Sequence, residues 1–332
     1  MRNVGYVRIR CKPHTGSFVA ILADRIIGPL TSPDPNHWEA GWPVPLLFLY
    51  LSSSLIERSP GFSMTGSAQL VQTAIRAATE AGKFLKAHVG KVRNVRTKEG
   101  EGRNLVSEVD QNSEKMIIDM ILQEYPGHSI LAEEGGTGAS VSDYRWVIDP
   151  LDGTTNFLHG IPVYCVTIGL EHKGKMIAGV VYDPNLDELF VADRGAGATL
   201  NGSPIHVSKT AALNESLLVT GFPYDVAANP DRAIERFVGF LKASRGVRRL
   251  GSAALDLCWV AAGRFDGFWE VNLHPWDIAG GIVIVEEAGG TVTDFSGNDA
   301  EISHKQILAS NRILHKEMTA VLTSAGISSG SL

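Results

Sequence analysis

The sequence predicts a mixed α and β fold, an α/β or α+β domain, over residues 64–332. Amphipathic helical patterns alternate there with short apolar strand patterns, and no proline-rich or charged linker divides them. Hydrophobic residues make up 44% of the chain and charged residues 20%, as in globular proteins that bury a large core. We therefore expect one tightly joined domain.

The first half of this domain contains two predicted helices. Apolar spacing over 70–85 predicts a helix that ends near Gly90, and a second helix follows Asp110 and closes before Pro126. Apolar runs bounded by turn residues predict the strands that follow, of which the third and fourth form a hairpin: 129–132, 145–148, 163–171, 176–182 and 189–192.

The second half continues the mixture without an internal repeat. Its apolar patterns predict three strands, at 216–220, 267–271 and 307–309. The longer periodic runs predict four helices, at 230–243, 253–262, 277–288 and 313–322. The helix at 277–288 is expected despite its paired glycines, and it ends at another glycine pair, Gly289-Gly290.

Residues 1–63 differ from the rest of the chain in being rich in proline. The apolar run at 44–56 is interrupted by Pro45 and three serines, and it is shorter than the ~20 residues that a membrane-spanning helix needs. No signal-peptide pattern is present. We expect 1–63 to be an N-terminal extension, either disordered or upstream of a natural start at Met64, and we expect no membrane association.

Net charge and cysteine usage narrow the class of protein. The net charge of −6 argues against a mainly electrostatic nucleic-acid binder. Three scattered cysteines, Cys11, Cys165 and Cys258, are too few for a disulfide framework or a cysteine-type zinc site. Reduced thiols and a cytoplasmic location are the simplest expectation.

Two aspartates, Asp149 and Asp152, stand where the strand predicted at 145–148 ends. A proline between them stiffens the turn, and Gly153 with the two threonines after it has the character of a helix start. Free backbone N–H groups at a helix start favour an anion. Two hard oxygen ligands beside an anion-binding turn indicate a Mg²⁺-dependent enzyme acting on a phosphate ester.

The same stretch carries a family resemblance. Residues 149–157, Asp-Pro-Leu-Asp-Gly-Thr-Thr-Asn-Phe, resemble the metal-binding signature of the inositol monophosphatase family. Residues 276–281, Trp-Asp-Ile-Ala-Gly-Gly, resemble a second signature of this family. Residues 131–135, Leu-Ala-Glu-Glu-Gly, resemble a third. Their order and spacing agree with the family from about residue 64 onward. The resemblance implies a layered αβαβα sandwich of the sugar-phosphatase type.

The resemblance also implies the ligands of two Mg²⁺ ions. Glu133, Asp149 and the backbone carbonyl of Leu151 would hold one ion. Asp149, Asp152 and Asp277 would hold the other, and a third, weaker ion would lie near Glu133. Taken alone, Asp277 could be only a helix N-cap.

Catalytic roles follow from the same resemblance. The backbone N–H groups of Gly153 and Thr154 would bind the phosphate. Thr155 and Glu133 would orient and deprotonate a water nucleophile, while Asp110 accepts a hydrogen bond from the Thr155 hydroxyl. Asp110 also reads as a helix N-cap. Lys98 corresponds to a family lysine on a mobile loop near the metals, and a solvated loop lysine is the alternative.

The resemblance also implies that substrate choice depends on four residues that would contact the hydroxyls of a polyol: Asp152, Ser252, Ala253 and Glu270. The resemblance thus implies a lithium-sensitive, homodimeric phosphatase that releases inositol from inositol monophosphate. An alternative is the same core acting on fructose 1,6-bisphosphate, histidinol phosphate or 3′-phosphoadenosine 5′-phosphate. An alternative of another class is a regulatory partner of the transcription machinery.

Overall fold

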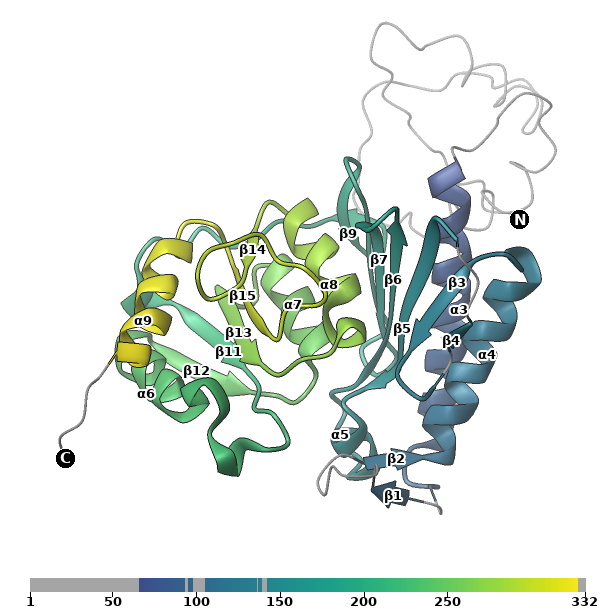
Figure 1. The fold of residues 1–332 in the computed structure, drawn as a ribbon, viewed down its shortest axis with the longest axis horizontal. Helices are drawn as coiled ribbons and strands as arrows, with labels where there is room; N and C mark the ends of the chain where they lie inside the picture. The colour runs from purple at the N-terminus through teal and green to yellow at the C-terminus, as the bar shows by residue number, and fades with distance from the viewer. Residues whose placement is uncertain (1–65, 93–94, 98–104, 136, 139–141, 328–332) are drawn as a thin grey trace, which may run out of the picture. The chain divides into compact units, whose positions relative to one another are not determined.

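Helices and sheets alternate in five layers, which confirms the expected αβαβα sandwich (Figure 1). The helices form three pairs that lie outside the larger sheet, between the two sheets, and outside the smaller sheet. In that order the pairs are α3 (Gly66–His88) with α4 (Glu108–Glu124), α7 (Ala253–Ala261) with α8 (Pro275–Glu287), and α6 (Ala233–Ala243) with α9 (His315–Ile327).

The computed structural model describes residues 66–92, 95–97, 105–135, 137–138 and 142–327. They belong to one compact unit, Met64–Leu332. The N-terminal extension expected at 1–63, and Lys98, lie outside the described residues, and the expectations about them stay predictions. Within the described part of the chain, every helix is too short or too polar to cross a membrane.

The larger sheet contains eight strands in the described residues, in the spatial order β10-β9-β8-β7-β6-β5-β3-β4. Only β3 and β5 pair in parallel, and the expected hairpin is present as β6 and β7. The strands are β3 (Ser129–Ala132), β4 (Thr137–Gly138), β5 (Tyr144–Asp152), β6 (Cys165–His172), β7 (Lys175–Asp183), β8 (Glu188–Asp193), β9 (Gly197–Leu200) and β10 (Ser203–Pro204).

The smaller sheet has the order β12-β11-β13-β15-β14 among the described residues. Because β11 pairs in parallel with β12 and β13, the carboxyl ends of these three strands lie at one edge, where the cleft described below opens. The strands are β11 (Leu217–Thr220), β12 (Gly246–Arg249), β13 (Gly267–Val271), β14 (Thr291–Thr293) and β15 (Gln306–Ser310). A separate pair, β1 (Val95–Thr97) and β2 (Leu105–Ser107), precedes α4.

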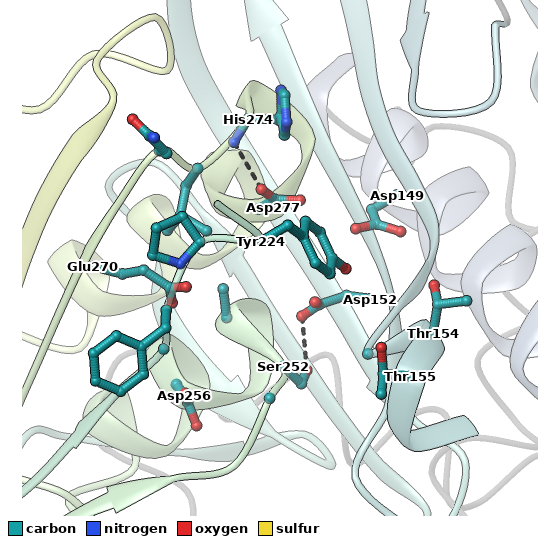
Figure 2. A pocket seen from close by; sticks show the side chains of 18 of the residues that line it. Asp149, Asp152, Thr154, Thr155, Tyr224, Ser252, Asp256, Glu270, His274 and Asp277 are labelled. Carbon is teal, nitrogen blue, oxygen red and sulfur yellow. Dashed lines mark hydrogen bonds between the residues drawn. The ribbon is translucent and has the colours of Figure 1, made fainter. Parts of the chain in front are cut away.

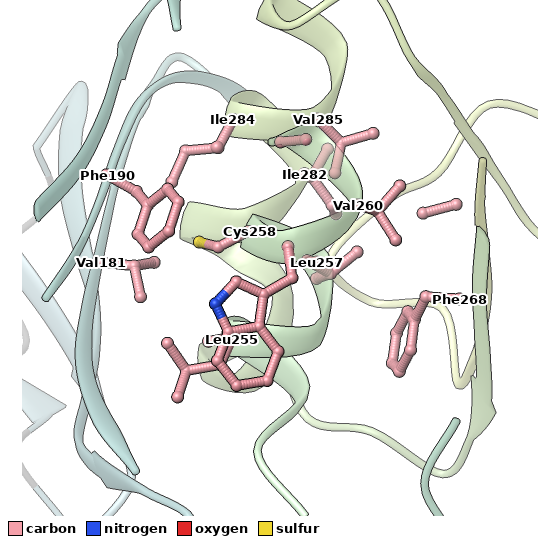
Figure 3. Close-up of a cluster of buried hydrophobic side chains, with 14 of the residues drawn as sticks. Val181, Phe190, Leu255, Leu257, Cys258, Val260, Phe268, Ile282, Ile284 and Val285 are labelled. Carbon is pink, nitrogen blue, oxygen red and sulfur yellow. The ribbon is translucent and has the colours of Figure 1, made fainter. Parts of the chain in front are cut away.

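Close backbone contact explains the paired glycines of α8. A Cβ on Gly179 of β7 would lie 2.2 Å from the carbonyl oxygen of Gly280, and one on Gly281 would lie 2.5 Å from Cδ1 of Leu257 in α7. Helix α8 therefore packs with its backbone directly against that of β7 at Gly280, and it accommodates the Leu257 side chain of α7 at Gly281. Figure 3 shows the core beside this contact, where apolar residues of α7 and α8 meet Val181, Phe190 and Phe268.

Several helices begin elsewhere than expected. Helix α6 starts at Ala233 rather than at 230, because Asp231 and Arg232 have left-handed φ values of 49° and 56°. Asp110 and Asp277 were each expected as a possible N-cap, and both instead occupy the third helical position. The N-caps are Ser107 for α4 and His274 for α8.

Candidate active site

A cleft opens between the end of β5, the first turns of α7 and α8, and the end of β13 (Figure 2). Eleven residues expected to bind metal, phosphate or polyol, or to act in catalysis, line this one cleft, although they come from distant parts of the chain. They are Glu133, Asp149, Leu151, Asp152, Gly153, Thr154, Thr155, Ser252, Ala253, Glu270 and Asp277. The structure thus brings both halves of the domain to one site.

A β-bulge positions the two aspartates of β5. The register with β6 shifts between Asp149 and Asp152, and Pro150 lies at this irregularity, where the ladder loses no N–H donor. The backbone N–H of Leu151 donates to Oδ1 of Asp149 over 2.9 Å. Both carboxylates consequently face the cleft from one strand end (Figure 2).

Gly153 turns the chain from β5 into the short helix α5 (Thr154–Leu158). Its φ is 95°, and a Cβ there would lie 2.8 Å from the carbonyl oxygen of Val163. Only glycine meets both conditions without strain. The expected helix start after Asp152 is therefore present, with Gly153 as its N-cap.

Asp152 joins the larger sheet to the start of α7. Its Oδ2 accepts hydrogen bonds from the Ser252 hydroxyl and from the backbone N–H of Ala254, each over 2.7 Å. Burial raises the pKa of Asp152 to about 6, although these hydrogen bonds lower it. The Ser252 hydroxyl donates its proton to Asp152. It can therefore only accept a hydrogen bond from a substrate hydroxyl.

Asp277 lies in the first turn of α8, on the opposite side of the cleft from β5. Its Oδ2 accepts a hydrogen bond from the backbone N–H of His274 over 2.7 Å, which caps the helix and fixes the carboxylate. Oδ2 of Asp277 thus caps the helix, and the Asp277 side chain also lines the cleft. The capping role and the expected metal-binding role are compatible at this position.

The threonine that contacts Asp110 is Thr154, so the expected contact with Thr155 is wrong. The Thr154 hydroxyl lies 3.2 Å from Oδ1 of Asp110 and 3.1 Å from the carbonyl oxygen of Leu151. Thr154 is buried because it begins α5 facing α4, whereas Thr155, one position further around the helix, is exposed. Oδ2 of Asp110 accepts hydrogen bonds from the backbone N–H and hydroxyl of Ser107.

The cleft carries an excess of negative charge. Burial raises the pKa of Asp149 and of Asp277 well above the usual range, and the charge of Glu133 is the next cause for both. The ion pairs of the described residues all lie away from Asp149, Asp152 and Asp277. A bound cation would relieve this repulsion.

The oxygen donors fit Mg²⁺, which prefers carboxylate and carbonyl ligands. As they stand, no three acidic, histidine or cysteine side chains of the described residues form a group that could hold one ion. Glu133 and Asp149 lie within hydrogen-bonding distance of each other, so these two carboxylates already converge, and a cation bound between them would be stabilised by both. The donor set therefore fits the ion, while the expected ligand assignments stay predictions.

Glu270 lies at the end of the cleft away from the β5 aspartates. Two further residues that line the cleft, Tyr224 and Asp256, were not predicted from the sequence. Burial raises the pKa of Glu270 to about 8, and the positive charge of Arg249 opposes that shift. Tyr224 reaches across the cleft between Asp277 and the β5 aspartates (Figure 2). Asp256 lies on α7, where one acidic residue within an otherwise apolar helix was a signal that could have revealed it.

Comparisons with known proteins agree with this geometry. The model of the inositol monophosphatase family matches residues 67–326. The inositol-1-monophosphatase of Synechocystis is 45% identical over 266 residues, which are 80% of this chain and 92% of that protein. A protein of Neisseria meningitidis named putative Nus factor SuhB is 43% identical over 254 residues, 76% of this chain and 97% of its own length.

A solved structure has a similar fold. The inositol monophosphatase from Anabaena superposes with a TM-score of 0.72 at 42% identity, over 78% of this chain and 97% of that one. The family match, the identity of the relatives and the shared fold agree. This chain belongs to the inositol monophosphatase family.

Proposed function

We propose that the protein is a Mg²⁺-dependent phosphatase that hydrolyses inositol monophosphate to inositol and phosphate. The observation that carries this proposal is the meeting of Glu133, Asp149, Asp152 and Asp277 in one cleft, beside the turn at Gly153. Asp152 and Asp277 each also hold a helix start, but those contacts do not require four carboxylates to share one cleft. Their arrangement is that of a site built to bind cations and a phosphate ester.

Five groups would hold the ions: the carboxylates of Glu133, Asp149, Asp152 and Asp277, and the carbonyl of Leu151. Magnesium bound there supplies charge neutralisation for the phosphate and lowers the pKa of water. The N–H groups of Gly153 and Thr154 would bind phosphate oxygens at the start of α5. Thr154, held by Asp110, takes the role first expected of Thr155 and orients the attacking water with Glu133.

A polyol substrate is supported by the opposite end of the cleft. With its pKa raised to about 8, Glu270 carries a proton at neutral pH, so it can donate to one hydroxyl and accept from another. A buried group of this kind penalises substrates that lack the matching hydroxyl. Inositol monophosphate therefore fits better than histidinol phosphate, which has no ring hydroxyl. Fructose 1,6-bisphosphate and 3′-phosphoadenosine 5′-phosphate, whose sugar rings carry hydroxyls, remain the alternative esters.

The test is phosphate release from purified protein with inositol 1-phosphate, fructose 1,6-bisphosphate, histidinol phosphate and 3′-phosphoadenosine 5′-phosphate, each with Mg²⁺ and with EDTA. We expect Mg²⁺-dependent release to be fastest from inositol 1-phosphate, and to be inhibited by Li⁺. Faster release from another ester would overturn the substrate assignment alone. Release that persists in EDTA would overturn the metal dependence.

A second role is favoured by the relatives named Nus factor SuhB, at 43% and 40% identity. We propose that this chain also binds a component of the transcription machinery. We propose separately that it forms a homodimer. We expect an Asp149→Asn variant to keep the fold and lose activity, and retention of a transcription component from lysate by this variant would support the binding role. Light scattering that gives the mass of one chain would contradict the dimer.

A further inference from the structure

Asn156 is a buried residue of α5 whose side-chain amide joins two separate segments of the chain. It is 6% exposed, and its Nδ2 group donates to the backbone carbonyl of Val163 over 2.8 Å and to that of Leu250 over 2.7 Å. Val163 precedes β6 of the larger sheet, and Leu250 follows β12 of the smaller sheet. Both hydrogens of the amide are therefore used, one toward each half of the domain.

Two glycine turns lie against this amide. Gly153 has a φ of 95°, and a Cβ there would lie 2.8 Å from the Val163 carbonyl oxygen that Asn156 binds. Gly251 has a φ of 92°, and a Cβ there would lie 3.0 Å from Nδ2 of Asn156 itself. Because both positions are glycine, the two turns can approach the same amide closely.

The two turns contribute different parts of the cleft lining. Gly153 and Thr154 line the cleft from one turn, and Ser252 and Ala253 line it from the other. Figure 2 shows Thr154 and Ser252 on the two segments that the amide joins. Among the described residues, the cleft lining does not include Asn156. Asn156 can therefore affect a bound ligand only by holding the two turns in place.

A second contact keeps the same two segments together. Oδ2 of Asp152 accepts hydrogen bonds from the Ser252 hydroxyl and from the backbone N–H of Ala254. If Asn156 were replaced, this contact would still join β5 to the start of α7. The expected result is a change in the spacing of the two turns rather than a separation of the two halves. Displacements of about 1 Å are enough to impair a site that grips a ligand at two ends.

We propose that Asn156 is a positioning residue that fixes the spacing between the turn at Gly153 and the turn at Gly251, and so sets the distance between the bound phosphate and the hydroxyls of its alcohol. This inference rests on the proposed phosphatase function and names the residue that matches the cleft to the ester of a cyclic polyol. A substrate that contacts both turns depends on their spacing. A substrate that contacts only the turn at Gly153 does not.

The test measures kcat and KM of Asn156→Ala with inositol 1-phosphate and with p-nitrophenyl phosphate, which has no ring hydroxyls. We expect KM for inositol 1-phosphate to rise about tenfold, the worth of one to two hydrogen bonds, with kcat within about twofold of wild type. Both constants for p-nitrophenyl phosphate should stay within about twofold of wild type, because Thr154 remains bonded to Asp110. Asn156→Asp keeps the shape of the side chain without the Nδ2 donors, and it should show the same difference between the substrates.

Asn311→Ala is the matched control for the loss of a buried amide. Nδ2 of Asn311 also donates two hydrogen bonds, to the Ser208 hydroxyl over 3.0 Å and to the Thr210 carbonyl over 2.8 Å. Asn311 is 2% exposed and lies outside the cleft lining. We expect both alanine variants to melt below the wild-type temperature, and only Asn156→Ala to change the ratio of the two KM values.

The outcomes distinguish the role of Asn156 from the proposed function. A ratio of KM values that is unchanged in both Asn156 variants, or equal losses on both substrates, would overturn the role of Asn156. A ratio that changes equally in Asn311→Ala would also overturn it, because general loss of stability would then explain the effect. Wild-type protein that cleaves p-nitrophenyl phosphate but not inositol 1-phosphate would overturn the proposed substrate, and with it the spacing that this residue is proposed to set.

Discussion

The hydroxyl of Thr154 donates a hydrogen bond to Oδ1 of Asp110 over 3.2 Å, joining the turn after β5 to the first turn of α4. Both residues are buried, and Asp110 is held in turn by Ser107. Burial raises the pKa of Asp110, while its hydrogen bonds with Ser107 lower it. The contact links the turn at Gly153 to a rigid helix, and it distinguishes Thr154 from the adjacent Thr155.

Replacing Thr154 by alanine should lower kcat about 100-fold or more, because the oriented hydroxyl that positions the attacking water is lost. Thr155→Ala is the matched control, since Thr155 is adjacent and exposed. We expect that control to keep kcat within about threefold of wild type. Steady-state phosphate release measures both variants, and a larger loss for Thr155→Ala would reverse the assignment.

Without metal, the stability of the protein should fall as the pH rises from about 4 to 7. The folded-state pKa values of Asp149, Asp152 and Asp277 are raised, to about 6 for Asp152, so the folded protein binds more protons than the unfolded chain. Stability then decreases with pH across that window. Thermal melting in EDTA at pH 5 and pH 7 measures this effect.

Magnesium should remove most of that pH dependence, because the cation stabilises the ionised carboxylates. The same melting series with Mg²⁺ is the comparison, and Mg²⁺-free buffer with EDTA at equal ionic strength is the control. A melting temperature that rises with pH in EDTA would contradict the picture of an uncompensated acidic cleft.

Gly221→Ala should impair the polyol end of the cleft. A Cβ on Gly221 would lie 2.2 Å from both carboxyl oxygens of Glu270, so the acid must move. We expect KM for inositol 1-phosphate to rise several-fold and the constants for p-nitrophenyl phosphate to stay unchanged. Gly127→Ala is the control, since a Cβ there meets nothing within 4 Å. Equal effects of both substitutions on inositol 1-phosphate would count against a role for Glu270.

Gly179→Ala should destabilise the fold. The added methyl group would lie 2.2 Å from the carbonyl oxygen of Gly280, which is backbone and cannot rotate away. Forcing α8 from the sheet should lower the free energy of unfolding by about 1–3 kcal/mol. Urea denaturation measures the change against the same Gly127→Ala control. A midpoint equal to that of the control would show that α8 adjusts without cost.

Long periodic segments were predictable from the sequence, and short ones were not. The helix expected at 70–85 is α3, and the hairpin expected at 163–171 and 176–182 is β6 and β7, because their apolar patterns extend over many residues. The two-residue strands β4 and β10 were missed because they have no period of their own. Their pairing depends on neighbouring strands that hold them in register.

The sequence by itself determined the motifs and a mixed α and β class, because these depend on residue types at fixed local spacing. The αβαβα layering and four acids of the cleft, Glu133, Asp149, Asp152 and Asp277, were implied by the family resemblance that the motifs carry. Only the tertiary structure decided that Thr154 rather than Thr155 contacts Asp110, that Ser252 donates to Asp152, and that Asp256 lies buried beside Glu270. Such contacts join positions far apart in the chain. Their geometry follows from how helices pack on sheets, which local patterns do not encode.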